Sequence, residues 1–196
     1  MRIITAALLL LLTSSLACGA PPKPRPLAGN GILTITSPIA NAPDKLPALI
    51  LYQEPGIGRF AEVEISDLPS LTPILQSTSG KALLAVTRTK DGWAKVIYEE
   101  SGSEAWLAID RHWRHEQWAN YLRGREIRVL NGLRKEYLQL RATPAPRAQA
   151  LESLSRQKSL RVIEVQENWA LVLVELQSSG WLRWRDDDGR FLVSIE

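Results

Sequence analysis

Two histidines and one cysteine are the residues best suited to metal or nucleophilic chemistry in this chain. His112 and His115 stand three positions apart in the stretch HWRHE, so a helix would place both on one face beside Glu116. Catalytic zinc sites need a third protein ligand, and zinc hydrolases use HEXXH or HXXEH spacing. No other histidine exists to complete such a site. We therefore expect exposed helix residues here, and neither a metal ion nor a cofactor.

Other catalytic patterns do not emerge from the sequence. The acidic run at Asp186–Gly189 lacks the alternating ligands and downstream glutamate of a calcium loop. Its position between GWLRWR and FLVSI favours a hairpin turn instead. We find no glycine-rich phosphate loop or serine elbow, and nothing singles out a catalytic pair of carboxylates. The sequence thus predicts no catalytic residue, and we expect a protein that is not an enzyme.

The N-terminus is typical of an exported protein. The apolar run Ile3–Leu12 is too short to span a bilayer and suits a signal-peptide core. Ser14–Cys18 then resembles a bacterial lipobox, although Ser15 stands where an aliphatic residue is usual. We expect residues 1–17 to be removed and Cys18 to carry the lipid that holds the protein on a membrane. The alternative is a secretory signal cut after Ala20, which would leave the single cysteine without a role.

The segment that follows is rich in proline. We interpret residues 18–47 as a linker that lifts the body of the protein off the membrane, broken by a possible short strand at Gly31–Thr36. The predicted location is the cell envelope, on a membrane and facing the periplasm or the cell exterior. Without lipidation the protein would be secreted.

Charge is distributed unevenly along a chain whose net charge is +3. Residues 111–147 carry nine Lys or Arg against three Asp or Glu, whereas both flanking segments are acidic. This basic belt could face anionic lipid head groups or an anionic wall polymer. The alternative is that it pairs with the acidic flanks of its own fold. We do not expect a nucleic-acid partner.

The second half of the chain repeats the first. Trp93 aligns with Trp169, and each follows a tight-turn pair, Asp91–Gly92 or Glu167–Asn168. Further aligned pairs are Leu84 with Leu160, Val86 with Val162, Ala94 with Ala170, Val96 with Val172, Trp106 with Trp181 and Tyr52 with Arg141. Short β-branched strands between turns indicate an all-β protein with two small barrels, at residues 48–110 and 137–196.

A short helix is expected between the barrels. Apolar residues in Asp110–Leu122 recur near helical spacing, and Gly124 would end the helix. We interpret residues 111–136 as a helical, basic linker in which Trp113 and Trp118 fasten the helix to a barrel.

These motifs resemble a family, the bacterial SH3-like (SH3b) domains. LQLRATPAP at Leu138–Pro146 is similar to the opening strand and loop of that family, and VIEVQENWALVLVELQSSGWL is similar to its second half. The first unit matches less well: it keeps DGWAKV and AWL, has Tyr52 in place of the arginine, and carries an insertion around Phe60–Leu75 that should enlarge its first loop. The resemblance implies tandem five-stranded SH3-like barrels that bind peptidoglycan or partner proteins.

Tryptophan is the residue that best suggests a binding surface. The chain has seven tryptophans against two phenylalanines, and a flat ring with a polar tip suits sugar or peptide binding. We take Tyr52, Trp93 and Trp169 as candidate ligand-binding residues, although Trp93 and Trp169 could equally pack in a barrel core or rim. Trp106 and Trp181 are expected in the cores.

The sequence therefore predicts a lipid-anchored, non-catalytic protein of the cell envelope that binds peptidoglycan or a protein partner. Two alternatives stay open. The chain could be a structural or assembly subunit of an envelope complex with no polymer binding, or an accessory subunit of a wall hydrolase that resides on another chain.

Overall fold

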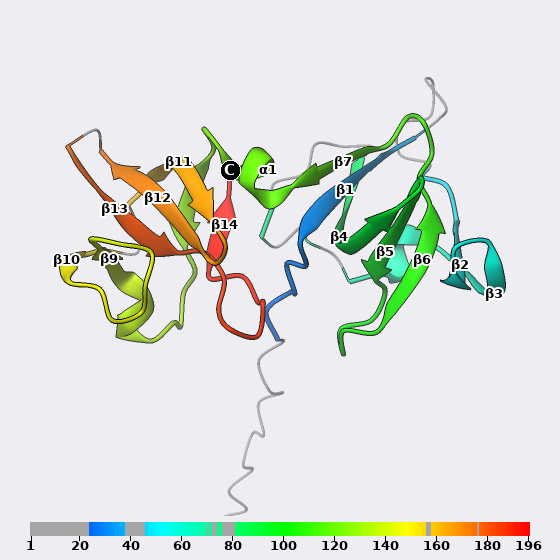
Figure 1. Ribbon diagram of the computed structural model, residues 1–196, viewed down its shortest axis with the longest axis horizontal. Helices are drawn as coiled ribbons and strands as arrows, with labels where there is room; N and C mark the ends of the chain where they lie inside the picture. The colour runs from blue at the N-terminus through cyan, green and yellow to red at the C-terminus, as the bar shows by residue number, and fades with distance from the viewer. Residues whose placement is uncertain are drawn as a thin grey trace, which may run out of the picture.

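The computed structural model shows an all-β protein with almost no helix, built from two seven-stranded antiparallel sheets (Figure 1). The structure describes residues 24–37, 46–69, 71, 74–75, 81–155, 158–175 and 177–196. Cys18 and the predicted signal peptide lie outside the described residues, as does part of the predicted linker. No helix in the described part of the chain has the length and apolar character needed to cross a bilayer.

Each sheet is formed by seven consecutive strands. The first contains β1 (Gly31–Thr36), β2 (Leu49–Glu54), β3 (Ile57–Val63), β4 (Lys81–Lys90), β5 (Trp93–Ile97), β6 (Glu104–Ala108) and β7 (Arg114–Gln117), in the order β3-β2-β6-β5-β4-β1-β7. The second contains β8 (Glu126–Val129), β9 (Gln139–Arg141), β10 (Ala150–Ser153), β11 (Leu160–Gln166), β12 (Trp169–Val174), β13 (Ser178–Arg183) and β14 (Val193–Ile195), in the order β10-β9-β13-β12-β11-β8-β14. The two orders are the same, strand for strand, and we call the two sheets with their connections the first and second repeats.

Local details confirm that the two halves repeat. The register of β4 and β5 shifts between Val86 and Arg88, and that of β11 and β12 shifts between Val162 and Glu164, which are the aligned positions. Such bulges insert an extra residue and bend the strand, so a shared position indicates a shared shape. The turn residues Asp91 and Glu167 both have positive φ, at 46° and 51°.

The predicted five-stranded barrels are wrong in strand number, and barrel closure is not found. Each sheet gains one strand at its start and one at its end, β1 and β7 or β8 and β14. Among the described strands, no pairing joins β3 to β7 or β10 to β14. Strand β1 has the bounds that we predicted for a short strand, Gly31–Thr36, but it pairs with both β4 and β7 inside the first sheet.

The helix between the repeats is shorter than predicted. Only Trp118–Leu122 forms α1, whereas Arg114–Gln117, which we expected to be helical, forms β7. The physical reason is that β1 offers a free edge, and its backbone hydrogen bonds outweigh the local helical periodicity. The helix does end just before Gly124, whose φ of 78° favours glycine. In the described part of the chain, the other helical segments are two 3-10 turns, η1 (Ile65–Asp67) and η2 (Lys135–Leu138).

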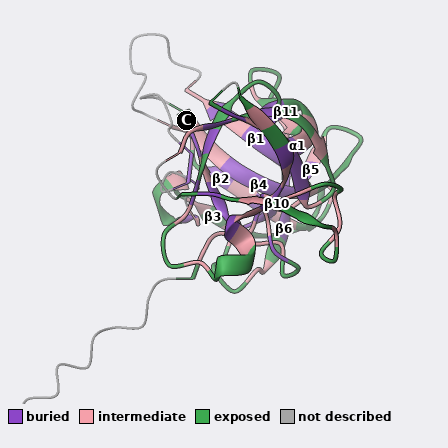
Figure 2. Cartoon of the chain, turned by 90° about the vertical axis from the view of Figure 1, so that its left-hand side faces the viewer, coloured by how far each residue is buried: buried purple, intermediate pink, exposed green. Residues whose placement is uncertain are grey.

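Strand β1 is buried on both faces because it lies between two cores. Leu33 belongs to the core of the first repeat, whereas Ile32 belongs to a larger core that continues into the second repeat. Both side chains are fully buried. Buried segments accordingly run through the central strands, and exposed segments follow the outer turns (Figure 2).

Two segments of the first half cross to the second repeat. The N-terminal strap, residues 24–30, lies against the turn that precedes β14 (Figure 1). The indole of Trp118 donates a 2.7 Å hydrogen bond to the carbonyl of Ala28 within this junction. The insertion that we expected to enlarge the first loop also reaches the second sheet, because Leu75 pairs in parallel with Ile195 of β14.

Candidate functional site

The outer face of the first sheet gathers aromatic side chains around Tyr52. Tyr52 on β2 lies opposite Trp106 on β6, and Trp106 lies opposite Lys95 on β5. Residues directly opposite in a sheet project to the same face, and so do residues two apart on one strand. Trp93 therefore shares this face with Lys95 and Tyr52.

Tyr52 and Trp93 form an open corner of two rings. Their ring centroids are 5.2 Å apart and the planes meet at 86°, so the edge of one ring meets the face of the other. Both side chains are half-buried. The β2–β3 turn borders the corner: a Cβ built on Gly56 would lie 3.7 Å from Trp93 Cζ2, and the next residue, Ile57, is 71% exposed. Two perpendicular rings beside an exposed apolar residue can hold a flat or apolar group of a ligand.

The corresponding tryptophan of the second repeat is covered by an arginine side chain. Trp169 is only 7% exposed, and Arg183, opposite it on β13, places its Cζ 5.7 Å from the indole centroid. In the first repeat the residue opposite Trp93 is Ala108, which is exposed and too small to cover an indole. The structure thus brings Tyr52 and Trp93 together and places Trp169 apart from them, on the other sheet.

The prediction that Trp106 and Trp181 are buried in the cores is confirmed for the burial of Trp106 and is wrong for Trp181. Trp106 is buried, but on the outer face, with the ammonium of Lys95 6.0 Å from its centroid. Trp181 is half-buried and lies opposite Arg141. The core positions belong to the next residues, Leu107 and Leu182, which project from the other side of the same strands.

Sequence reasoning missed the aromatic cluster at the junction of the repeats. Trp184 and Phe191 are almost fully buried and lie 5.7 Å and 5.1 Å from Trp118, measured between ring centroids. Trp118, which we predicted to fasten the helix, therefore contacts the second repeat. The available signal in the sequence was the alternation of Leu182 and Trp184, which indicates a buried face. It does not show which residues pack against that face.

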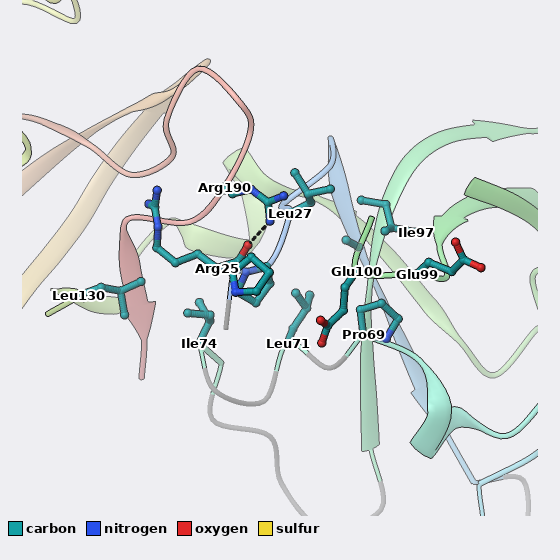
Figure 3. A pocket seen from close by; sticks show the side chains of 13 residues that line it. Arg25, Leu27, Pro69, Leu71, Ile74, Ile97, Glu99, Glu100, Leu130 and Arg190 are labelled. Carbon is teal, nitrogen blue, oxygen red and sulfur yellow. Dashed lines mark hydrogen bonds between the residues drawn. The ribbon is translucent and has the colours of Figure 1, made fainter. Parts of the chain in front are cut away.

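A cavity of about 340 Å³ lies between the repeats, beside the N-terminal strap (Figure 3). Its wall is mainly aliphatic and includes Leu27, Ile74 and Leu130. Two of its charged side chains are already engaged: Arg25 pairs with Asp186 at 2.6 Å, and Arg190 donates to the Arg25 carbonyl. We regard the cavity as part of the junction, because its lining comes from the N-terminal strap and from both repeats. No residue that we predicted for binding lines it.

The histidines do not share a helix face. His112 lies in a turn, where its Nε2 accepts a 3.0 Å hydrogen bond from Arg111, and His115 lies on β7. Burial lowers the pKa of His115, and the nearby Glu116 carboxylate opposes that shift. Within the residues that the structure describes, no group of three metal-binding side chains gathers.

The acidic run 186–189 forms the predicted hairpin turn. Arg185 pairs with Phe191 across the turn, and the Gly189 amide donates to the Asp186 carbonyl. Asp186 is the buried member: it accepts hydrogen bonds from the Arg190 amide at 2.8 Å and from Arg25. This aspartate therefore ties the turn to the N-terminal strap.

The basic belt is partly neutralised by its own fold. Arg128 pairs with Glu196 of the acidic C-terminal segment at 2.8 Å, and Arg114 pairs with Glu116 within the belt at 3.0 Å. The pair of Arg128 with Glu196 agrees with the interpretation that the belt pairs with the acidic flanks of its own fold.

Two solved structures are similar to this chain over most of its length. The structure of NlpC2 from Trichomonas vaginalis covers 86% of this chain at 7% sequence identity, with a TM-score of 0.35. The structure of NlpC1 from the same organism covers 83% at 9% identity, with a TM-score of 0.34. The chain spans about half the length of either structure, since it covers 49% of each. No protein-family model matches the chain, and no curated protein matches it.

Proposed function

We propose that this chain is a non-catalytic binding protein of the cell envelope, which captures peptidoglycan or an envelope protein on the outer face of its first sheet. The open corner of Tyr52 and Trp93 carries the proposal, because it is the aligned aromatic position that the fold leaves uncovered. Aromatic anchors of this kind commonly dominate small interfaces, at about 2 kcal/mol or more each. The SH3-like sequence motifs support the same class of function.

The envelope location rests on the N-terminal sequence. A short apolar core followed by the lipobox-like stretch before Cys18 supports export and lipid anchoring. Residues 26 and 28 are bonded to the turn before β14, and because they follow Cys18 by only eight to ten positions, an anchor at Cys18 would hold the junction of the two repeats close to the membrane. Labelling with a fatty acid tests this part: label should enter the native chain but not the Cys18→Ser variant.

Binding to isolated peptidoglycan tests the capture function. The full chain in detergent should co-sediment with the polymer, and the double variant Tyr52→Ala/Trp93→Ala should lose that binding by about tenfold or more, as expected for an aromatic anchor. Ile163→Ser is the matched control, because it removes an exposed apolar residue (44% exposed) from the second sheet. Circular dichroism must show that all variants are folded.

A variant that covers the Trp93 ring provides a second test of the proposed site. Ala108→Arg should place a guanidinium over Trp93, as Arg183 lies over Trp169, and thereby weaken capture without removing any aromatic ring. Retention of full binding by both the double variant and Ala108→Arg would contradict the proposed site. Failure of the native chain to bind peptidoglycan would shift the proposal to a protein partner, to be sought by cross-linking in the envelope.

An assembly role is the second candidate, and exposed apolar residues at the edge strands favour it. Phe60 and Leu151 occupy equivalent bulges on β3 and β10, and they are 45% and 53% exposed. Matching apolar residues on both repeats suit contact with another envelope protein, including a wall hydrolase that this chain would assist. In that case Phe60→Ser and Leu151→Ser should disrupt the complex, whereas the Tyr52/Trp93 double variant should not.

A further inference from the structure

The guanidinium of Arg183 lies between two aromatic rings on the second sheet. Its Cζ is 5.7 Å from the centroid of Trp169 and 6.0 Å from that of Tyr137, which belongs to η2. Only 13% of the side chain is exposed, and its Nε is buried without a hydrogen-bond partner among the described residues. Buried donors without partners are rare in folded proteins, because they lose their hydration and gain nothing in exchange. This nitrogen can therefore donate to an acceptor that the described residues do not supply.

The acceptor that Arg183 does have comes from a movable residue. Its Nη2 donates to the carboxylate of Asp187, on the turn that precedes β14. Asp187 is 83% exposed, whereas its neighbour Asp186 is buried and held by Arg25 and the Arg190 amide. The Asp187 side chain can consequently swing into solvent while Asp186 keeps the turn in place.

The geometry of the guanidinium indicates what would replace Asp187. Nε and Nη2 project from the same side of the planar group, so one carboxylate can accept a hydrogen bond from each. In the structure Asp187 is bonded at Nη2 while Nε stays unsatisfied. A ligand carboxylate placed side-on would satisfy both donors at once. The two nearby rings favour the cation.

Side chains of both charges lie around this group: Asp187 and Asp188 stand on the turn, and three basic residues stand at η2 and on β9. Arg134 and Lys135 precede Tyr137 in the chain and are exposed, and Arg134 shares its charge with Glu136 at 3.8 Å. Arg141 lies on the neighbouring strand β9, where its Nη1 donates to the Ala148 carbonyl. These cations offset part of the negative charge that Asp187 and Asp188 contribute near Arg183.

We propose that Arg183 anchors a carboxylate-binding site on the second repeat, and that Asp187 is an internal competitor which the ligand's carboxylate displaces. The site is separate from the Tyr52–Trp93 corner and does not depend on it. Because Ala108 stands at the position of Arg183 in the first repeat, the two repeats recognise different chemistry: an apolar or flat group on the first, a carboxylate on the second.

Nuclear magnetic resonance of the full chain in detergent tests the site directly. The Nε–H signal of Arg183, identified by its loss in Arg183→Lys, should move downfield and saturate on titration with N-acetylglycine. N-acetylglycinamide, which lacks the carboxylate, should leave the signal in place. Inorganic phosphate tests for a different anion: a response stronger than that to N-acetylglycine would overturn the assignment to carboxylates, and so would an equal response to the amide.

Variants of the turn test the competition. Asp187→Asn should tighten N-acetylglycine binding by about two- to fivefold, the usual size of an exposed ion pair. Asp188→Asn is the matched control on the same turn, and it should change affinity less because Asp188 is not the residue that bonds Arg183. Unchanged or weaker binding in Asp187→Asn contradicts the proposal, and this exposed substitution remains informative even if Arg183→Lys fails to fold.

Discussion

At the scale of single residues, equivalent tryptophans differ because of the residue opposite each one. Ala108 leaves Trp93 half-exposed, whereas Arg183 covers Trp169 down to 7% exposure. One exchange on a neighbouring strand thus converts a ring that is available to a ligand into a ring that stabilises the fold. The same type of residue at the same point of a repeat can therefore serve binding in one copy and packing in the other.

We expect Trp169→Ala to cost ~3–5 kcal/mol in the free energy of unfolding, because it empties a buried site. Trp93→Ala should cost less, on the order of 1–2 kcal/mol, since part of that indole already lies in water. Urea denaturation followed by circular dichroism measures both values. Equal costs would mean that the two rings are equally buried, contrary to the structure.

At the scale of elements, the N-terminal strap approaches the first sheet closely at Gly29. Its φ is 62°, and a Cβ there would lie 2.6 Å from the Val86 carbonyl oxygen of β4. Glycine is required at this point both for the backbone conformation and for the space. The strap is thus fitted to β4 on one side, while Arg185 donates to the Gly29 carbonyl from the second repeat.

Gly29→Ala should therefore lower the free energy of unfolding by much more than the positive φ at this position would cost by itself. Gly132→Ala is the matched control, because Gly132 has a φ of 77° but a Cβ there would meet nothing within 4 Å. The control should lose about 1–2 kcal/mol, the usual cost of the left-handed conformation for a residue with a Cβ. Gly29→Ala should lose roughly twice that or more in the same urea titration. A similar loss in both would show that the strap does not press on β4.

At the scale of the whole molecule, the larger of the two cores joins the two repeats. The larger hydrophobic cluster joins Ile32 and Ile97 of the first repeat to Phe191 and Ile195 of the second, and Trp118 contacts Phe191 at the junction. The backbone pairing of Leu75 with Ile195 adds a link that side-chain changes cannot remove. The repeats are therefore expected to behave as one cooperative unit.

Calorimetry of the full chain should accordingly give a single unfolding transition whose calorimetric and van't Hoff enthalpies agree. The double variant Arg25→Ala/Asp186→Ala removes the ion pair between the strap and the turn, and it should lower the transition temperature or divide the transition in two. Arg59→Ala/Glu62→Ala is the control, since it removes an exposed ion pair within the first repeat. Two transitions in the native chain would contradict the shared core.

The sequence by itself determined the repeat and much of its local structure. The turns at Asp91 and Glu167, the strands that begin at Trp93 and Trp169, and the alignment of Tyr52 with Arg141 are all found. These features depend on neighbouring residues, because turn conformation and the alternation of side chains are local properties of the chain.

Tertiary structure alone decided which strands complete each sheet and which aromatic rings remain open. Strand β7 forms on the edge of β1, about 80 residues away along the chain, so its helical periodicity misled the prediction. The faces of Trp106 and Trp181 likewise depend on pairing register, and a shift of one residue reverses every side chain of a strand. Register follows from contacts between distant segments, and these contacts also place Arg183 over Trp169 and leave Trp93 beside Ala108.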